Sequence, residues 1–294
     1  MTAKAEADSL ELCVIQTSDA VKYRRMLKAT SRTAAEYCRI HGFSYDSYVG
    51  IKRGFHGAHA TFNRMFMLQE MVDRGYKGWV LYMDADAYFY DLGFDLRAYL
   101  ADKQDRSAIM ATIQGETVPW HINAGVLFFN LGHPEAARLI ADWKARYMRV
   151  PDEVLQTLVS VWDVENDQTM LYYTLNDNQD IRDTVLFEDA MLFNHKDGRF
   201  IRQFLAAFEA DVDARTDAIE LEVAHVLQGT PAQQPGDVTA EMIVTGLYER
   251  ILRRRPDPGG LRAYGDVIRQ HGPANGRSIV SNCLRESDEY KSLR

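Results

Sequence analysis

The chain has 294 residues, of which 46% are hydrophobic and 26% charged, and its formal net charge is −8. A chain of this length can bury a large core in one domain or two, so it does not need the disulfides or structural metals that hold small proteins together. The composition excludes an intrinsically disordered chain. The acidic balance argues against nucleic acid as a partner, because phosphate binding needs a concentrated basic face.

The N-terminal residues lack the basic start and apolar core of a secretory signal, and no stretch reaches the roughly 18 uncharged apolar residues of a membrane helix. We therefore expect a cytoplasmic protein without a transmembrane segment, with peripheral attachment at the inner face of the membrane as the alternative. Cys13, Cys38 and Cys283 are far apart and lack the spacing of metal ligands, which predicts reduced thiols.

Short β-rich runs alternate with helical stretches from the start of the chain. Strands are predicted at residues 12–16, 44–49, 78–83, 108–112, 125–129 and 184–187. Helices are predicted at 21–41, 58–74, 134–147 and 167–175. This alternation predicts an α/β fold with a mainly parallel sheet and helices on both faces. In such sheets ligands bind beyond the carboxyl ends of the strands.

A change of composition divides the chain. Residues 228–237, QGTPAQQPGD, hold two prolines, two glycines and three glutamines without a sizeable apolar residue, which predicts a linker. One α/β domain is then expected at 1–227 and a small all-α domain of three short helices at 238–294. Within the small domain, Asp257 is predicted to cap a helix whose first residue is Pro258.

Two aspartates follow the predicted strand in the segment GWVLYMDADAYFYD. Asp84 and Asp86 are two residues apart, so their side chains leave the strand on one side and can reach one hard divalent cation. The same spacing in Asp211-Val212-Asp213 follows no apolar strand and is interpreted as solvated helix surface. The context therefore predicts a metal or catalytic site at Asp84 and Asp86, with a polar turn as the alternative.

Three further segments place polar side chains beside apolar runs. His195 ends one of them, and two carboxylates with one imidazole form a set that suits Mn²⁺, although a lone histidine can also be structural. Asn123 and Gly125 lie at the start of a predicted strand. Asp167 and Gln168 lie at the start of a predicted helix, where Asp167 is alternatively an N-cap or first-turn carboxylate.

The segments VLYMDADAYFYDLGFDL, INAGVLFFNL, NDQTML and HKDG occur in the order found in retaining GT-A glycosyltransferases. The chain most resembles the bacterial galactosyltransferase and glycogenin family, and MLKATSRTAAEYCRIHGFSY with DADA is also similar to the galactosyl/xylosyltransferase family. The resemblance covers residues 10–205. It implies a GT-A (Rossmann-like) fold and the transfer of a sugar from a nucleotide sugar, a UDP-sugar, to an acceptor hydroxyl of a glycan or other molecule. It also implies retention of the anomeric configuration and Mn²⁺ or Mg²⁺ as cofactor.

The resemblance assigns roles to individual residues. The matched positions are Asp84, Asp86 and His195 for the metal; Thr17, Asp19, Tyr23, Arg64, Asp84, Asn123 and Gly125 for the donor; and Asp167 and Gln168 for the groups near the anomeric carbon. The family's histidine motif continues to a lysine that holds the diphosphate, and this chain departs from it there. Lys196, Arg199 or Arg202 is expected to take that role.

The tail resembles a bacterial domain of unknown function through YERILRRRPDPGGL and SDEYKSL. That resemblance names a module without naming an activity. Separately, this small domain is expected to offer a contact for a partner or another copy of the chain. Two alternative functions remain for the whole protein. One is a HAD-like phosphohydrolase with Asp84 as nucleophile, although Tyr88 stands where that family has threonine or valine. The other is a non-catalytic protein that binds a sugar nucleotide or a glycan.

Overall fold

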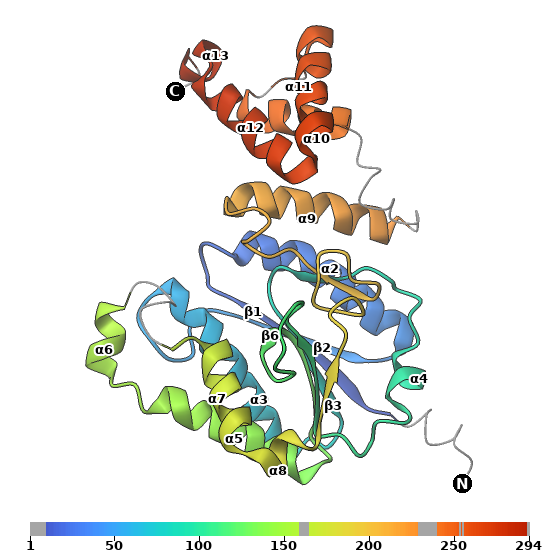
Figure 1. Ribbon diagram of the computed structural model, residues 1–294, viewed down its shortest axis with the longest axis vertical. Helices are drawn as coiled ribbons and strands as arrows, with labels where there is room; N and C mark the ends of the chain where they lie inside the picture. Colours follow the sequence, from blue (N-terminus) through green and yellow to red (C-terminus); the bar gives the residue numbers. More distant parts are fainter. Residues whose placement is uncertain (1–9, 159–164, 229–239, 253, 255, 293–294) are drawn as a thin grey trace. The chain divides into compact units, whose positions relative to one another are not determined.

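The structure is a computed structural model that describes residues 10–158, 165–228, 240–252, 254 and 256–292 (Figure 1). The chain divides into two compact units, one made of Met1–Leu205 with Val212–Gly229 and the other of Ala206–Asp211 with Thr230–Arg294. The predicted linker at 228–237 lies outside the described residues apart from Gln228.

The first unit is built on a six-stranded sheet with the order β2-β1-β3-β6-β5-β7, and it also contains a two-stranded sheet of β4 and β8 (Figure 1). The strands are β1 (Leu12–Ser18), β2 (Ser44–Val49), β3 (Trp79–Met83), β4 (Ala87–Phe89), β5 (Ala108–Thr112), β6 (Ile122–Asn130), β7 (Val185–Glu188) and β8 (Ile201–Gln203). In the large sheet β6 is antiparallel to β3 and β5, whereas the other neighbours are parallel. The predicted α/β fold with a mostly parallel sheet is confirmed.

Helices cover both faces of the large sheet (Figure 1). The described helices of the first unit are α2 (Arg24–His41), the 3₁₀ helix η1 (Gly57–Phe62), α3 (Asn63–Asp73), α4 (Leu96–Leu100), α5 (Pro134–Met148), α6 (Asp152–Thr157), α7 (Asp167–Asp177), α8 (Gln179–Arg182) and α9 (Val212–Leu227). Helices α3, α5 and α7 share a core with one face of the sheet, and α2 shares a second core with the other face.

The sequence of β3 shows why both faces need cover. All five of its residues are buried. Val80 and Tyr82 pack into the core on the side of α3, whereas Trp79, Leu81 and Met83 pack into the core on the side of α2. Because successive side chains of a strand point to opposite faces, a continuous apolar run is stable only between two layers of helices.

The helix predicted from residue 21 begins at Arg24 instead. The preceding turn is held by Asp19, whose Oδ1 accepts the backbone N–H groups of Val21 at 2.7 Å and Lys22 at 2.6 Å, and whose Oδ2 accepts that of Tyr23 at 3.0 Å. A side chain that binds three successive N–H groups favours a turn over a helix at these residues. The apolar pattern alone did not reveal this local competition.

The helix predicted at 58–74 is two elements, η1 and α3. His56 and His59 form a reciprocal capping box that begins η1. Asn63 begins α3 and ties it to the sheet, because its Nδ2 donates to Thr17 Oγ1 at 2.9 Å and to Gly50 O at 2.8 Å. These contacts hold the first turn of α3 beside the carboxyl ends of β1 and β2.

The second unit contains four described helices, where the sequence predicted three. They are α10 (Ala240–Ile251), α11 (Pro258–His271), α12 (Pro273–Glu286) and α13 (Asp288–Ser292). Asp257 caps α11 as predicted, since its side chain accepts the N–H groups of Gly259 and Gly260, and Pro258 is the first helical residue. None of the described helices combines the length and apolar character that a bilayer crossing requires.

The three cysteines are free, in line with the predicted thiols. Burial raises the pKa of Cys13 to about 11 and that of Cys38 to about 12. Both thiols are therefore protonated at neutral pH and unreactive, because the thiolate is the nucleophile.

We expect Asp19→Ala to lower the free energy of unfolding by about 1 kcal/mol, the usual effect of removing a capping side chain. Asp19→Asn keeps one carbonyl oxygen that can accept the N–H groups of Val21 and Lys22, so this variant should lose less free energy of unfolding. Urea unfolding followed by circular dichroism measures both values. Equal losses in the two variants would contradict the structural role of this carboxylate.

Candidate active site

The aspartate pair lies in a tight turn between β3 and β4. The Asp84 N–H donates to Gly125 O at 2.7 Å, which extends the pairing of β3 with β6 by one residue, and the Ala87 N–H donates to Asp84 O at 3.0 Å. Beneath the turn, Gln16 Nε2 donates to the backbone oxygens of Asp84 and Ala87, both at 3.2 Å. The backbone of the turn is thus fixed, and so are the Cα positions from which the Asp84 and Asp86 side chains extend.

Arg64, in the first turn of α3, is the central cation of the site. Its side chain is 4% exposed, and its guanidinium binds Asp84 Oδ1 at 2.6 Å and Asp167 Oδ2 at 3.1 Å. It also donates to the backbone oxygens of Thr61 and Ala124. Burial lowers the pKa of Arg64, but the charges of Asp167 and Asp84 outweigh burial and raise it above its ordinary value. The guanidinium is therefore a permanent positive charge.

Asp84 and Asp86 direct oxygens toward one point. Gln203 Nε2 lies 3.3 Å from Asp84 Oδ2 and 2.9 Å from Asp86 Oδ1. Burial, together with the nearby charge of Asp86, raises the pKa of Asp84 from 3.8 to about 7, against the opposing effect of Arg64. Burial also raises the pKa of Asp86, although Arg215 and Gln203 oppose the shift. The two carboxylates are thus held close together, and the nearby arginines only partly compensate the cost of burying their negative charges.

Asp167 and Gln168 lie at the start of α7 and face Arg64 and β6. Asp167 is the first helical residue, after the N-cap Asn166, so of the predicted alternative it is the first-turn carboxylate and not the N-cap. Its Oδ1 accepts the Thr61 hydroxyl at 2.9 Å, and its Oδ2 pairs with Arg64. Gln168 Oε1 accepts the Ala124 N–H at 3.1 Å. The helix start therefore joins the aspartate turn through Arg64 and through β6.

Asn123 and Gly125 lie inside β6, which begins at Ile122 and not at residue 125 as predicted. Asn123 Nδ2 donates to Gln203 Oε1 at 3.1 Å, and the Gly125 N–H donates to Asn123 Oδ1 at 3.0 Å. Because β6 runs against β3, its first residues lie at the edge where β3 ends. The reversed strand brings both residues to the aspartates.

His195 approaches this edge through its backbone. Its carbonyl accepts the Gln203 N–H at 3.1 Å, and its Nδ1 accepts the Asp197 N–H at 3.1 Å. The preceding Asn194 has a φ of 75°, an uncommon conformation for a residue with a side chain. Within the described part of the chain, no three histidine, cysteine, aspartate or glutamate side chains group closely enough to hold a metal ion. The structure therefore does not assemble Asp84, Asp86 and His195 as a ligand set.

The basic residues expected near a diphosphate differ in their surroundings. Arg202 is 6% exposed, stacks on Tyr90 with its guanidinium carbon 3.3 Å from the ring centre, and pairs with Glu222 at 3.4 Å. Arg199 is exposed on the surface. Lys196 pairs with the neighbouring Asp197 and keeps 37% of its side chain exposed. Arg202 is committed to the fold, which leaves Lys196 and Arg199 accessible.

Thr17 and Tyr23 flank the end of β1, and both have protein partners. The Thr17 hydroxyl donates to Tyr48 O at 2.9 Å and accepts from Asn63. Tyr23 receives a hydrogen bond at 3.2 Å from Arg215 of α9. Arg215 is 1% exposed, and its charge acts on Asp86. The sequence prediction missed Arg215, since its only signal is an arginine within an otherwise ordinary helix.

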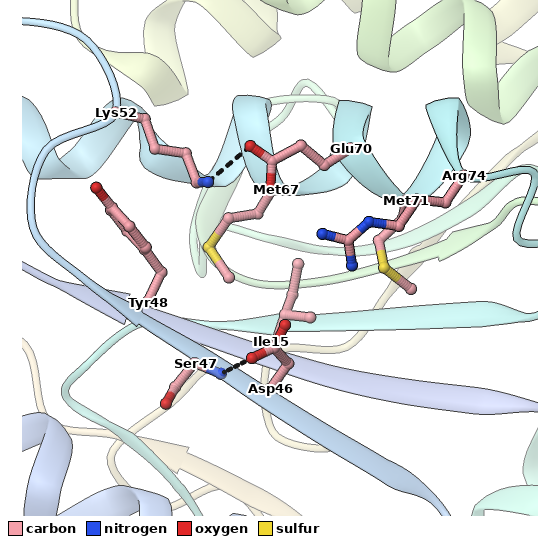
Figure 2. A pocket seen from close by; sticks show the side chains of 9 residues that line it. All are labelled: Ile15, Asp46, Ser47, Tyr48, Lys52, Met67, Glu70, Met71 and Arg74. Carbon is pink, nitrogen blue, oxygen red and sulfur yellow. Dashed lines mark hydrogen bonds and ion pairs between the residues drawn. The ribbon is translucent and has the colours of Figure 1, made fainter.

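A separate pocket of about 200 Å³ lies between β1, β2 and α3 (Figure 2). Lys52 Nζ pairs with Glu70 at 2.7 Å and lies 4.4 Å from the centre of the Tyr48 ring. Figure 2 shows Asp46 on β2 and Arg74 beside the end of α3, both lining the pocket. None of the predicted site residues lines this pocket. It is therefore distinct from the aspartate turn.

No protein-family model and no curated protein matches this sequence. In structure the chain is similar to a glycosyltransferase involved in the glycosylation of the major capsid of PBCV-1, with a TM-score of 0.53 and 15% identity over 71% of this chain and 99% of that one. More distant similarities are to the bifunctional glycosyltransferase WbbM, with a TM-score of 0.37 and 11% identity over 76% of this chain and 45% of that one, and to S. aureus TarS in complex with UDP, with a TM-score of 0.33 and 9% identity over 97% and 92%. Of these three similarities, the first has a TM-score above 0.5 and shows a shared fold.

The raised pKa values predict how stability depends on pH. Because the folded pKa of Asp84 is about 7 and its ordinary value is 3.8, the folded state binds more protons between these values, so the free energy of unfolding should fall as the pH rises from about 4 to 7. Asp86→Asn removes one buried charge and its repulsion of Asp84. In EDTA at pH 8 we expect this variant to be about 1 kcal/mol more stable than the wild type, with a weaker pH dependence.

Urea unfolding at pH 5 and pH 8 provides the measurement. Asp213→Asn is the matched control, because Asp213 ends the other Asp-x-Asp sequence and is exposed on α9. A destabilised Asp86→Asn at pH 8, or an equal gain in the control, would contradict the electrostatic interpretation.

Proposed function

We propose that this protein is a metal-dependent retaining glycosyltransferase of the GT-A type, which transfers a sugar from a UDP-sugar to an acceptor hydroxyl. The observation that carries the proposal is the convergence of Asp84 and Asp86 at the end of β3, in a fold shared with a glycosyltransferase. In sheets of this class the ends of the strands are where ligands bind. The ordered sequence motifs add independent support.

A divalent cation fits the aspartate turn. Asp84 Oδ2 and Asp86 Oδ1 approach one point, and carboxylate oxygens are the ligands that Mg²⁺ and Mn²⁺ prefer. Burial raises the pKa of both groups, and the neighbouring charge of Asp86 adds to the shift at Asp84. An added positive charge would therefore be favourable here. The Asp84 side chain is 27% exposed, so solvent reaches it. We propose that Asp84 and Asp86 hold the ion, which would supply positive charge to a departing diphosphate.

The remaining residues would position the donor and stabilise charge. Lys196 is the residue proposed to bind the diphosphate, because it is accessible and follows His195 directly. Thr17, Asp19 and Tyr23 would place the nucleotide base near the end of β1. The strand residues Asn123 and Gly125 would line the sugar pocket. Each of these assignments is based on the sequence resemblance and on the position of the residues near one edge of the sheet.

Asp167 and Gln168 are proposed for the sugar side of the reaction. Asp167 is oriented from both oxygens, by Thr61 and by Arg64, so its charge is fixed in place before a substrate arrives. A preorganised negative charge can stabilise a developing positive anomeric carbon at no cost of reorganisation. Gln168 is held by β6 beside it. The acceptor hydroxyl would give its proton to the leaving diphosphate.

The phosphohydrolase alternative requires a free oxygen on Asp84. Asp84 Oδ1 instead accepts from Arg64 at 2.6 Å and from the Tyr82 hydroxyl at 2.6 Å, and its Oδ2 accepts from Gln203. Both lone pairs of Oδ1 are therefore engaged, and Oδ2 faces the same point as Asp86 Oδ1, where a second carboxylate would repel an anionic phosphate. This environment favours the binding of a cation over nucleophilic attack. For the second unit, we propose a contact surface for a partner or a second copy of the chain.

The donor can be identified by thermal unfolding with nucleoside diphosphates and nucleotide sugars, each with Mn²⁺ or with EDTA. A ligand at about a hundred times its dissociation constant adds ~2.7 kcal/mol of apparent stability. We expect UDP or a UDP-sugar to stabilise the protein only with metal present. No shift with any nucleotide under either condition would contradict the proposed donor.

Asp86→Ala should reduce metal-dependent transfer by about a hundredfold or more, because it removes a preorganised group that binds the counterion of the leaving group. Asp213→Ala, in the other Asp-x-Asp sequence, should leave transfer unchanged. Release of UDP in the presence of an acceptor measures both rates. Turnover near that of the wild type in Asp86→Ala would contradict the metal site.

A further inference from the structure

The side-chain amide of Gln203 lies at the point where the proposed cation ligands meet. Its Nε2 donates to Asp84 Oδ2 at 3.3 Å and to Asp86 Oδ1 at 2.9 Å. We infer that Gln203 is a built-in placeholder for the cation: it bridges the two carboxylates in the unliganded protein and must move aside when a metal ion binds. This inference rests on the proposed function, because it concerns the same site.

The orientation of the Gln203 amide follows from its hydrogen bonds. The Gly125 backbone N–H can only donate, so the atom of Asn123 that it reaches, at 3.0 Å, is the oxygen Oδ1. Asn123 therefore presents Nδ2 to Gln203, which accepts it on Oε1 at 3.1 Å. Gln203 is left with Nε2 facing the carboxylates. An amide nitrogen with two N–H groups cannot ligate a cation, so the amide and the ion exclude each other in this arrangement.

The backbone of Gln203 is anchored and does not need to move. Gln203 pairs with Ala87 at the start of β4, and its N–H donates to His195 O at 3.1 Å. The next residue, Phe204, donates its N–H to Asp86 O at 3.1 Å. The backbone around Gln203 is thus held by hydrogen bonds both to His195 and to the aspartate turn. Only rotation of the Gln203 side chain is required to clear the point between the carboxylates.

Gly125 provides the space in which the amide lies. A Cβ atom at residue 125 would lie 2.1 Å from Gln203 Nε2 and 2.3 Å from its Oε1, far inside contact distance. Gly125 was predicted from the family resemblance to line a sugar pocket, and the structure gives the absence of its side chain an additional physical reason. A side chain at residue 125 and the Gln203 amide could not both occupy this space.

A cation that binds alone must break the hydrogen bonds from Gln203 to two charged groups, whereas a cation that arrives with a nucleoside diphosphate gains phosphate ligands that offset this loss. Hydrogen bonds to charged groups are among the stronger ones in proteins. The wild-type protein should therefore bind metal weakly without nucleotide and much more tightly with it. Removal of the amide should raise the affinity for Mn²⁺ alone by about tenfold or more, because one hydrogen bond to a charged group already corresponds to a factor of about ten.

The test is titration of the full chain with Mn²⁺ in the absence of nucleotide, with free Mn²⁺ measured by its electron paramagnetic resonance signal. The variants are Gln203→Ala and Gln203→Asn, the second of which keeps an amide but shortens its reach. Gln16→Ala is the matched control, because Gln16 is also a buried glutamine that donates to this turn, but to backbone oxygens of Asp84 and Ala87. Both Gln203 variants should bind Mn²⁺ more tightly than the wild type, by about tenfold or more, and the control should not. The additional gain from UDP should be smaller in the Gln203 variants.

The possible failures can be told apart. Unchanged or weaker Mn²⁺ binding in both Gln203 variants, with the wild type still binding Mn²⁺ tightly in the presence of UDP, overturns the placeholder role and leaves the proposed function standing. Tighter Mn²⁺ binding in the variants, with no effect of UDP on any protein, supports the placeholder role and overturns the proposed donor. Absence of Mn²⁺ binding in the wild type and in both variants, with or without UDP, overturns both.

Discussion

The buried guanidinium of Arg64 is the interaction on which the site depends. It stands between Asp84, at the end of β3, and Asp167, at the start of α7, and it also donates to backbone oxygens of η1 and β6. The Asp167 carboxylate, of which 9% is exposed, would be very unfavourable without a paired cation. One side chain of α3 therefore joins four other parts of the fold, and charge compensation positions these elements as strongly as apolar packing does.

The reversed direction of β6 determines which residues can meet these charges. Strand ends of one direction gather at one edge of a sheet, so a parallel β6 would bring its last residues to the aspartate turn. The antiparallel β6 brings its first residues instead, and Asn123 and Gly125 then reach Gln203 and Asp84. The departure from a fully parallel sheet is thus a condition for the site.

Local patterns made part of this arrangement predictable. The end of an apolar strand placed Asp84 and Asp86, and the start of a helix placed Asp167, because burial and helix starts depend on neighbouring residues. Gln203 and Arg215 could not be predicted in the same way, since their importance comes from contacts with residues far away in the chain, such as Asp86 for Gln203 and Tyr23 for Arg215. The strands β4 and β8 have three residues each, too few for a period of two to be recognised.

The charges at the site do not balance. The carboxylates of Asp84, Asp86 and Asp167 face the guanidinium groups of Arg64 and Arg215, and the pKa of Asp84 is raised to about 7 as a result of burial and crowding. A third arginine would stabilise the fold, but it would also remove the negative potential on which the proposed cation depends. An amide such as that of Gln203 donates hydrogen bonds without adding charge, so it steadies the two carboxylates while their negative potential persists. This is the compromise expected of a fold that gives up stability for a binding site of the kind proposed.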